Sequence, residues 1–414
     1  MKRLLKISFD QALLSLTPIL TWFCLSILID RDLINVFTIV YPLQMLYGVI
    51  RAPFATGANI SRVKDKNKHA AMSGMILGII LTVAVFGFVL LNVDGYITFM
   101  SVDSATYRTF TIYAIGILIL QTIFSFILER LYYENKNSQA NRYSVVFNIL
   151  SFAAVIVPSM LTKNQTVIVT IALGIMSLMT LIVLARTWQR FKFKLNLLHC
   201  LKYDSVTLAS YTASFFVFLF GLSNALEFGP QYGLAITFVS LITDTQWDVF
   251  DSVATLARID ISKHQFNFKQ SLRNAYRLNL ILFTTIAIMF LTLQGFYELD
   301  LGITLAYLSM EILTFLIDPA QYLYTSYLQL NWSASKTTTN KIVARCLRLG
   351  LSLLPTPFCT SIGMVACSIY QLVSTKILFR KNYAIDKTGK VYKRRRKHQH
   401  VALQPQYDEL VIDK

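Results

Sequence analysis

Residues 233–256 read GLAITFVSLITDTQWDVFDSVATL, a segment apolar enough to cross a bilayer that nevertheless carries Asp244, Asp248 and Asp251. An ionisable group at the centre of a membrane helix costs about 2.5–3.5 kcal/mol on insertion scales. Because successive helical residues turn by about 100°, positions i, i+4 and i+7 share one narrow stripe. The segment therefore predicts a helix with one side toward lipid and one toward a polar interior. Such a helix is typical of proteins that move a solute across a membrane.

The composition of the whole chain supports this interpretation. Of its 414 residues, 55% are hydrophobic and 15% are charged, and the mean hydropathy is +0.52. A soluble protein of this length could not cover so much apolar surface, so a polytopic helical membrane protein is expected. The first apolar run continues to Ile29 without a small-residue cleavage site, which favours a retained span over a signal peptide. The five cysteines form no CxxC pair and predict core residues, so neither a metal nor a cofactor is expected.

Hydropathy predicts twelve spans, six in each half of the chain. Those of the first half are 8–29, 33–60, 70–91, 106–129, 143–162 and 165–185, and those of the second are 204–226, 232–257, 274–295, 301–327, 342–360 and 362–379. Alternate connections are basic, and we count Lys341 and Arg345 among them. The positive-inside rule then accounts for the net charge of +17 and places both termini in the cytoplasm. Nucleic-acid binding is not favoured.

The two halves of the chain repeat one another. Arg62 corresponds to Arg258 and Asn135 to Asn331, and both pairs are 196 residues apart (258 − 62 and 331 − 135). An even number of spans per repeat predicts a pseudo-two-fold axis along the membrane normal. We therefore expect an all-α polytopic membrane protein with twelve transmembrane helices in two six-helix lobes. The predicted parts are an N-terminal lobe 1–185, a cytoplasmic interfacial linker 186–203, a C-terminal lobe 204–380 and a basic cytoplasmic tail 381–414.

The repeat places the second span opposite the eighth across a central cavity. It brings Arg51 beside Asp248, and we expect these two residues to pair. The residues predicted to line the cavity are Arg51, Asp244, Asp248, Asp251, Gln44, Tyr47 and Tyr307. Two interpretations stay open: a static ion pair that locks the halves together, or a switchable carboxylate cluster around a substrate.

The tenth span carries a second polar face. Glu311 and Asp318 lie on it at helical spacing, and Pro319 kinks the helix and frees a backbone carbonyl that a cation can approach. The sequence from Asp318, DPAQYLYTSYLQLN, resembles the tenth-helix pattern of the multidrug and toxic compound extrusion (MATE) transporters. YPLQMLYGVIRAPFATGANISRVKDK, from residue 41 onward, is similar to their second helix and the loop after it. The resemblance covers nearly the whole chain as topology.

This resemblance implies two lobes with alternating access, and export driven by inward flow of Na⁺ or H⁺. It implies that Asp318, with Glu311 and Gln321, binds the coupling cation. One departure concerns the first helix, where the family carries an acid about fifteen residues after a proline. Here Pro18 is followed by Asp30 and Asp32 at +12 and +14, near the end of the span.

The expected function is that of an ion-coupled secondary antiporter that exports cationic or amphiphilic small molecules. A cationic cargo is favoured because the predicted cavity holds more acidic than basic residues. The alternative is a flippase for lipid-linked oligosaccharide or polysaccharide precursors, in which Arg51 would hold a diphosphate. Another twelve-helix porter fold is less favoured, because the loop after the second span lacks glycines. We expect a monomer in the plasma membrane of a bacterium, with the lipid bilayer and the substrate as its partners.

An enzyme is not expected, because all five histidines fall in predicted loops or the tail, and no catalytic motif occurs.

Overall fold

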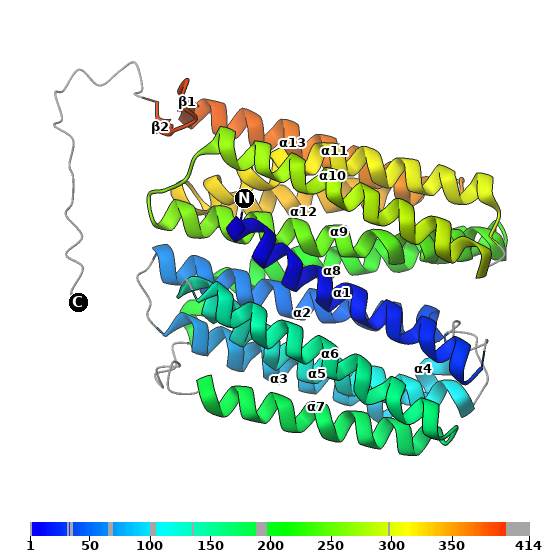
Figure 1. Ribbon diagram of the computed structural model, residues 1–414. Helices are drawn as coiled ribbons and strands as arrows, with labels where there is room; N and C mark the ends of the chain where they lie inside the picture. The colour runs from blue at the N-terminus through cyan, green and yellow to red at the C-terminus, as the bar shows by residue number, and fades with distance from the viewer. Residues whose placement is uncertain are drawn as a thin grey trace, which may run out of the picture.

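The computed structural model describes residues 2–30, 33, 36–64, 69–99, 105–134, 136–187, 197–296 and 299–394. Within these ranges the side chains of Asp244 and Asp248 are not described. In the part of the chain that is described, twelve helices of 18 residues or more run roughly alongside one another, as Figure 1 shows. Their number and order confirm the predicted all-α architecture with twelve long helices.

The helices of the first lobe are α1 (Lys2–Leu28), α2 (Val36–Lys64), α3 (Ala70–Leu91), the short α4 (Val93–Phe99), α5 (Ala105–Tyr133), α6 (Asn137–Leu161) and α7 (Gln165–Thr187). Those of the second lobe are α8 (Leu197–Glu227), α9 (Pro230–Ser262), α10 (Phe268–Leu293), α11 (Leu301–Asn331), α12 (Ala334–Leu351) and α13 (Cys359–Asn382). A 3₁₀ turn (Gln294–Phe296) follows α10. Helix α8 begins inside the segment predicted as a linker. We call the end of the bundle where α1 begins and α13 ends the basic end, and the other the opposite end.

The eleventh predicted span, 342–360, is wrong in its boundaries. Helix α12 begins eight residues earlier because Ser333 caps it: the serine Oγ accepts a hydrogen bond from the backbone N–H three residues on, at 3.2 Å. It ends at Leu351, and Pro355 and Pro357 lie in the connection that follows. Lys341 and Arg345 are therefore inside helix α12 and not in a connection.

Part of the predicted solvated tail is folded. Strands β1 (Tyr383–Ile385) and β2 (Val391–Lys393) form an antiparallel hairpin after α13, whereas residues 395–414 lie outside the described ranges. The Tyr383 hydroxyl donates to the Asn331 carbonyl at 2.7 Å, and the Phe268 N–H donates to the Gly389 carbonyl at 2.9 Å. The turn places Gly389 at a φ of +93°, a conformation that favours glycine. The hairpin thus ties the basic ends of α10, α11 and α13 together.

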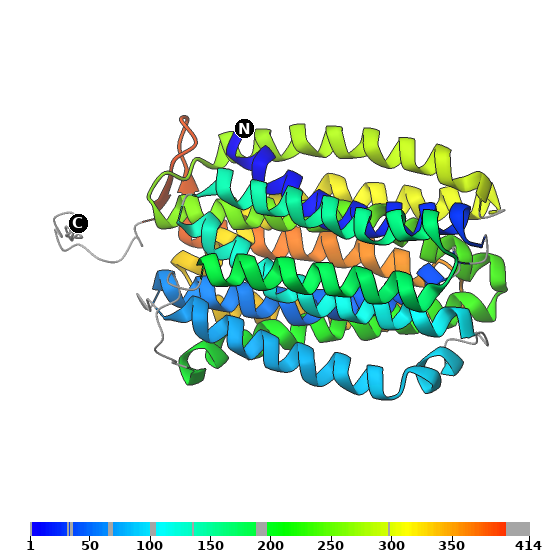
Figure 2. The same cartoon turned by 60° about the horizontal axis from the view of Figure 1, so that its bottom comes forward.

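The two lobes meet through α1 with α9 and α2 with α8. Figures 1 and 2 show α1 crossing obliquely from the second lobe toward the first. At the basic end Arg3 pairs with Asp260 at 2.9 Å, and further along the same two helices Ser8 and Ser252 are hydrogen-bonded at 2.7 Å. Nearer the opposite end Tyr41 packs edge-on against Phe218, with ring centroids 5.4 Å apart.

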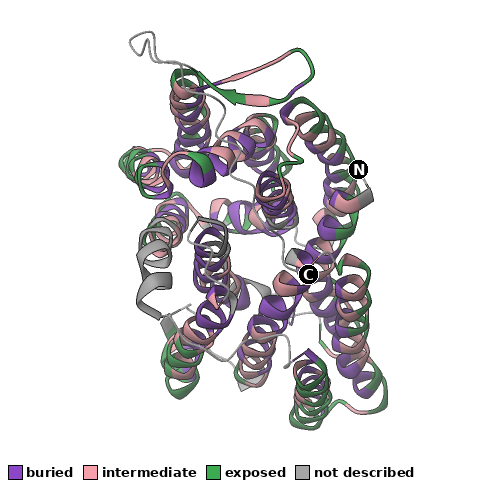
Figure 3. Cartoon of the chain, turned by 90° about the vertical axis from the view of Figure 1, so that its left-hand side faces the viewer, coloured by how far each residue is buried: buried purple, intermediate pink, exposed green. Residues whose placement is uncertain are grey.

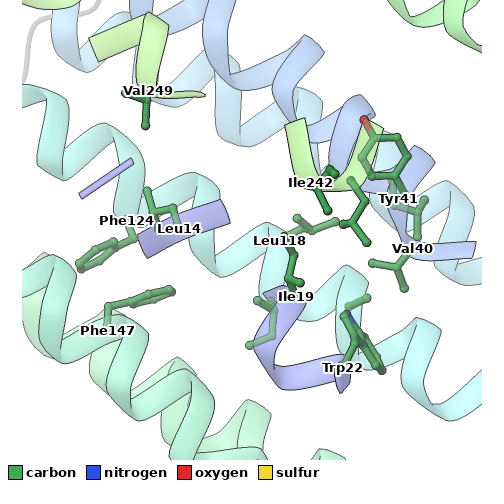
Figure 4. Packing of buried hydrophobic residues seen from close by; sticks show 14 of the residues in the cluster. Leu14, Ile19, Trp22, Val40, Tyr41, Leu118, Phe124, Phe147, Ile242 and Val249 are labelled. Atoms are coloured by element: carbon green, nitrogen blue, oxygen red, sulfur yellow. The ribbon is translucent and has the colours of Figure 1, made fainter. Parts of the chain in front are cut away.

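One apolar cluster runs through both lobes. Figure 4 shows Leu14 and Ile19 of α1, Leu118 of α5 and Ile242 of α9 in it, with Phe124 and Phe147 stacked at 4.2 Å. Seen along the bundle in Figure 3, buried residues gather on the helix faces that meet their neighbours. Large apolar side chains are also exposed on the outside, as a lipid-facing surface requires. Of the helices searched, which include only described residues, eight are long and apolar enough to cross a membrane.

A close approach of α2 and α3 yields a test of this packing. A Cβ added at Gly74 would lie 2.9 Å from the Phe54 carbonyl oxygen and 2.9 Å from the Ala58 Cβ. We expect Gly74→Ala to destabilise the protein by about 1–3 kcal/mol, because backbone must move to admit the methyl group. Gly87→Ala on the same helix is the control, since nothing lies within 4 Å of its Cβ position. Thermal unfolding in detergent measures both, and an equal or higher midpoint for Gly74→Ala would contradict the packing.

Candidate functional site

A cavity of about 250 Å³ lies between the lobes. Its wall comes from α1, α2 and α5 of the first lobe and from α8, α9, α11, α12 and α13 of the second. This volume is slightly below the range of ordinary small-molecule sites. We call it the central cavity.

Charged side chains from both lobes face the central cavity. The basic residues in its wall are Arg51, Lys341, Arg345 and Arg348, and the acidic ones are Asp251, Glu311 and Asp318. Among the described lining residues the bases therefore outnumber the acids, four to three. The expectation of an acidic cavity also rested on Asp244 and Asp248, whose side chains lie outside the description.

Helix α12 supplies three of the four cations. Lys341, Arg345 and Arg348 follow one another at i, i+4 and i+7, so they share one face of the helix, and we call them the α12 ladder. Sequence reasoning missed the ladder because the helix was predicted to begin too late. The spacing that identified the aspartates of α9 would have found it, together with Ser333 as a helix cap.

Each of the three described acids in the cavity wall is opposed by a cation of the α12 ladder. Glu311 interacts electrostatically with Arg348, Asp318 with Arg345 and Lys341, and Lys341 with Asp251. None of these pairs approaches within the 4.0 Å of an ion pair in the described part of the chain. The charges of α11 and α12 are thus matched in depth but not in direct contact.

Glu311 and Asp318 are the most deeply placed acids of the wall. Glu311 is 8% exposed and Asp318 is 3% exposed. Both belong to α11, and Pro319 directly follows Asp318 in that helix. Trp247 lies near the carboxyl group of Glu311, and Ser368 lies near that of Asp318. One buried oxygen of each carboxylate, Oε2 of Glu311 and Oδ2 of Asp318, has no hydrogen-bond partner among the described residues. A buried acceptor left in this way costs roughly 1–3 kcal/mol, so each is suited to hold a proton or bind a ligand donor.

Gln321 lies one turn from Asp318 and points to α13. Its side-chain N–H₂ donates to Gln371 Oε1 at 2.8 Å and to Thr325 Oγ1 at 3.2 Å. It lines the central cavity beside Asp318, so the structure brings all three predicted coupling residues together.

The first lobe contributes Arg51 with its neighbours on α2. The guanidinium donates to Gln11 Oε1 at 3.2 Å and lies 5.6 Å from the centre of the Tyr47 ring, a cation–π contact. Gln44 and Tyr47 line the cavity on the same helix. The predicted pairing of Arg51 with Asp248 stays a prediction.

Tyr307 was predicted to line the cavity and does not. Its hydroxyl donates to the Pro357 carbonyl at 2.7 Å, and its ring packs on Phe358 at 4.9 Å. The residue lies toward the opposite end of α11, where the α12–α13 connection covers it. We interpret it as a packing residue.

A buried acid of α1 was also missed. Asp10 is fully buried and accepts hydrogen bonds from Tyr132 and from Asn141, the latter at 2.9 Å. Its position inside the first predicted span was the available signal. These bonds hold α1 against α5 and α6 and are separate from the central cavity.

The placement of the α12 ladder is testable by chemical labelling. In a cysteine-free background, we expect a charged methanethiosulfonate reagent to label Arg345→Cys, because position 345 faces the cavity. Val343→Cys, whose side chain is 47% exposed on the outer surface, should resist the reagent because lipid would cover it. The protein is labelled in liposomes, and mass spectrometry of the intact protein then measures the extent of labelling of each variant. Labelling of position 343 with protection of position 345 would reverse the assigned orientation of α12.

No known family model matches the chain, and no curated protein sequence matches it. Solved structures do. A crystal structure of a MATE mutant is 13% identical, covering 92% of this chain and 95% of that one, with a TM-score of 0.66. An outward-facing multidrug resistance MATE family transporter of the MOP superfamily is 14% identical over 92% and 95%, also at 0.66.

A third similar structure is a MOP superfamily transporter from Pyrococcus furiosus whose binding pocket has reversed polarity. It is 12% identical, covers 92% of this chain and 96% of its own, and has a TM-score of 0.65. At sequence identities this low, the structural similarity establishes the fold alone. The chain therefore has the two-lobed fold of the MATE transporters of the MOP superfamily.

Proposed function

We propose that this protein is an ion-coupled membrane transporter that carries an amphiphilic small molecule through the central cavity by alternating access. The observation that carries the proposal is the pair Glu311 and Asp318, two buried carboxylates in the cavity wall, each with one oxygen without a partner among the described residues. Ionisable groups inside a membrane protein mark ion and proton pathways. The basic end would face the cytoplasm under the positive-inside rule.

The coupling ion that we favour is a proton. Hard metal cations bind through several oxygen ligands, whereas a carboxylate needs only one free oxygen to take a proton. Each proton bound at Glu311 or Asp318 changes the charge of the cavity by one unit. In a region of low dielectric that change alters the attraction to the α12 ladder strongly, and so alters the balance between lobe arrangements.

Alternating access requires the contacts between the lobes to open in turn at the two ends. At the basic end these are the pair Arg3–Asp260 and an apolar cluster of Ile60 with Ile261 and Leu330. Toward the opposite end Tyr41 and Phe218 meet. Each of these contacts involves only a few side chains, so two rigid lobes can break it and form it again as they rock around a fixed site.

The two carboxylates account for export by antiport most directly if the cargo is a cation. A cation and a proton compete for the same carboxylates, so a proton that enters from outside displaces the cargo. This is the form of the function that the family resemblance implies, and it remains our first candidate.

An anionic, lipid-linked cargo is the second candidate, and the α12 ladder favours it. Arginine binds phosphate through charge-assisted, bidentate hydrogen bonds, and two arginines of the ladder line the cavity with Arg51. Such a cargo would bind better once Glu311 and Asp318 are protonated, because the cations are then freed from opposing charge. The reversed pocket polarity of the Pyrococcus furiosus transporter supports the view that this fold can accept either sign of charge.

Transport can be tested in liposomes with an imposed pH or Na⁺ gradient and ethidium as the cationic probe. We expect a pH gradient to drive ethidium movement and Asp318→Asn to reduce it at least tenfold, because the amide cannot carry the proton. Asp94→Asn is the control, since Asp94 is an exposed residue paired with Arg108 far from the cavity. Full pH-driven transport by Asp318→Asn would remove this residue from the coupling site, and a response to Na⁺ alone would replace the proton.

The charge of the cargo is tested by exchanging the probe. Arg345→Gln and Arg348→Gln should weaken binding of farnesyl diphosphate about tenfold or more if the cargo is anionic, because each removes a phosphate-binding group. The same variants should bind ethidium as well as or better than the parent protein. Fluorescence titration of labelled farnesyl diphosphate and of ethidium gives both affinities. Unchanged diphosphate binding would exclude the second candidate.

A further inference from the structure

A second, much smaller cavity of about 10 Å³ lies next to the central one. Its wall is polar and includes Arg258 of α9, Gln329 of α11 and Thr338 of α12. A volume near 10–15 Å³ is what one water molecule needs, and this wall offers it several hydrogen-bonding groups. We call this space the small chamber.

Four residues line both the central cavity and the small chamber, namely Tyr211, Asp251, Tyr322 and Lys341. They therefore form the partition between the two spaces. Tyr322 is held by stacking on Phe250, with centroids 5.9 Å apart. The partition consists of one carboxylate, one amine and two phenols, all groups that exchange protons. The small chamber behind it, at about 10 Å³, is too small to hold an organic molecule.

The partition continues the line of acids that begins on α11. Tyr322 interacts electrostatically with both Asp318 and Asp251, and so does Lys341. Tyr322 and Lys341 are thus within electrostatic reach of both Asp318 and Asp251. Arg258, Arg345 and Arg51 are the other charges that act here, on Tyr211 from α9, α12 and α2.

The small chamber lies toward the basic end, within the second lobe. Gln329 is two residues from the end of α11, and Thr338 is four residues from the start of α12. Its lining comes from α8, α9, α11 and α12 only. A proton that reaches it can therefore approach the basic end while the lobes stay closed there by Arg3–Asp260.

We propose that the partition conducts protons but not cargo, and that Asp251 is its proton carrier. The proton leaves the carboxyl group of Asp318 and binds a carboxylate oxygen of Asp251, which then gives it to a water molecule in the small chamber as hydronium. Asp318 is left ionised, and Asp251 returns to its carboxylate form. The inference rests on the proposed proton coupling and adds a separate proton exit to it.

Two cations prevent an open leak, one in the partition (Lys341) and one in the wall of the small chamber (Arg258). Lys341 and Arg258 repel a free hydronium ion, as basic residues do in pores that exclude protons. Crossing the partition therefore requires the carboxylate of Asp251, whose negative charge offsets theirs.

The experiment uses the full-length protein in liposomes, with a pH-sensitive dye inside and ethidium as the transported probe. Because Asp251 also lines the central cavity, Asp251→Asn is judged by the number of protons released per ethidium molecule transported, a ratio that a change in cargo affinity leaves unaltered. This ratio should fall at least tenfold, whereas Asp251→Glu should restore it and Asp94→Asn should leave it unchanged. The parental ratio in Asp251→Asn would overturn the proposal.

Two further results separate the possible failures. If the parent protein shows no pH-driven transport, the proposed function fails rather than this inference. If Asp251→Asn loses even ethidium exchange, Gln329→Leu decides, because it keeps the acid but removes a polar wall of the small chamber. Slower proton release with unchanged exchange would support the proton exit, and release at the parental rate would exclude it.

Discussion

The structure depends on charges held inside an apolar bundle. Charged groups in such an interior are tolerated only where opposite charge, hydrogen bonds or water compensate them. Here Glu311 and Asp318 oppose the α12 ladder at matched depth without direct ion pairs among the described residues. Because compensation is incomplete, a bound proton or a charged cargo changes the energy of the site substantially. That sensitivity is what an ion-coupled transporter requires.

The rest of the fold positions these charges. Ser333 starts α12 early enough to bring Lys341 to the cavity, and Pro319 follows Asp318 on α11. Asp10 holds α1 against the first lobe, while Ser8 of the same helix contacts Ser252 of the second. Helix α1 is thus attached to both lobes at neighbouring residues, so a motion between the lobes must strain or break one of these attachments.

Much of the fold could be predicted from the sequence, because hydropathy, basic connections and the 196-residue repeat all report on membrane topology. The lining of the central cavity was predicted in part. Glu311, Asp318 and Gln321 were found because helical spacing places them on one face. The α12 ladder was missed because basic residues near a helix end look like a cytoplasmic connection. Tyr307 was misplaced because helical periodicity predicts which side of α11 a residue lies on, but not which other segment covers that residue.

The most direct test of the account is a simultaneous measurement of proton and cargo movement in liposomes containing the purified protein. The account predicts that the two fluxes appear together, in a fixed ratio, and that each stops when the other is prevented. Net cargo transport against its gradient that continues at the same rate without any proton flux would contradict it.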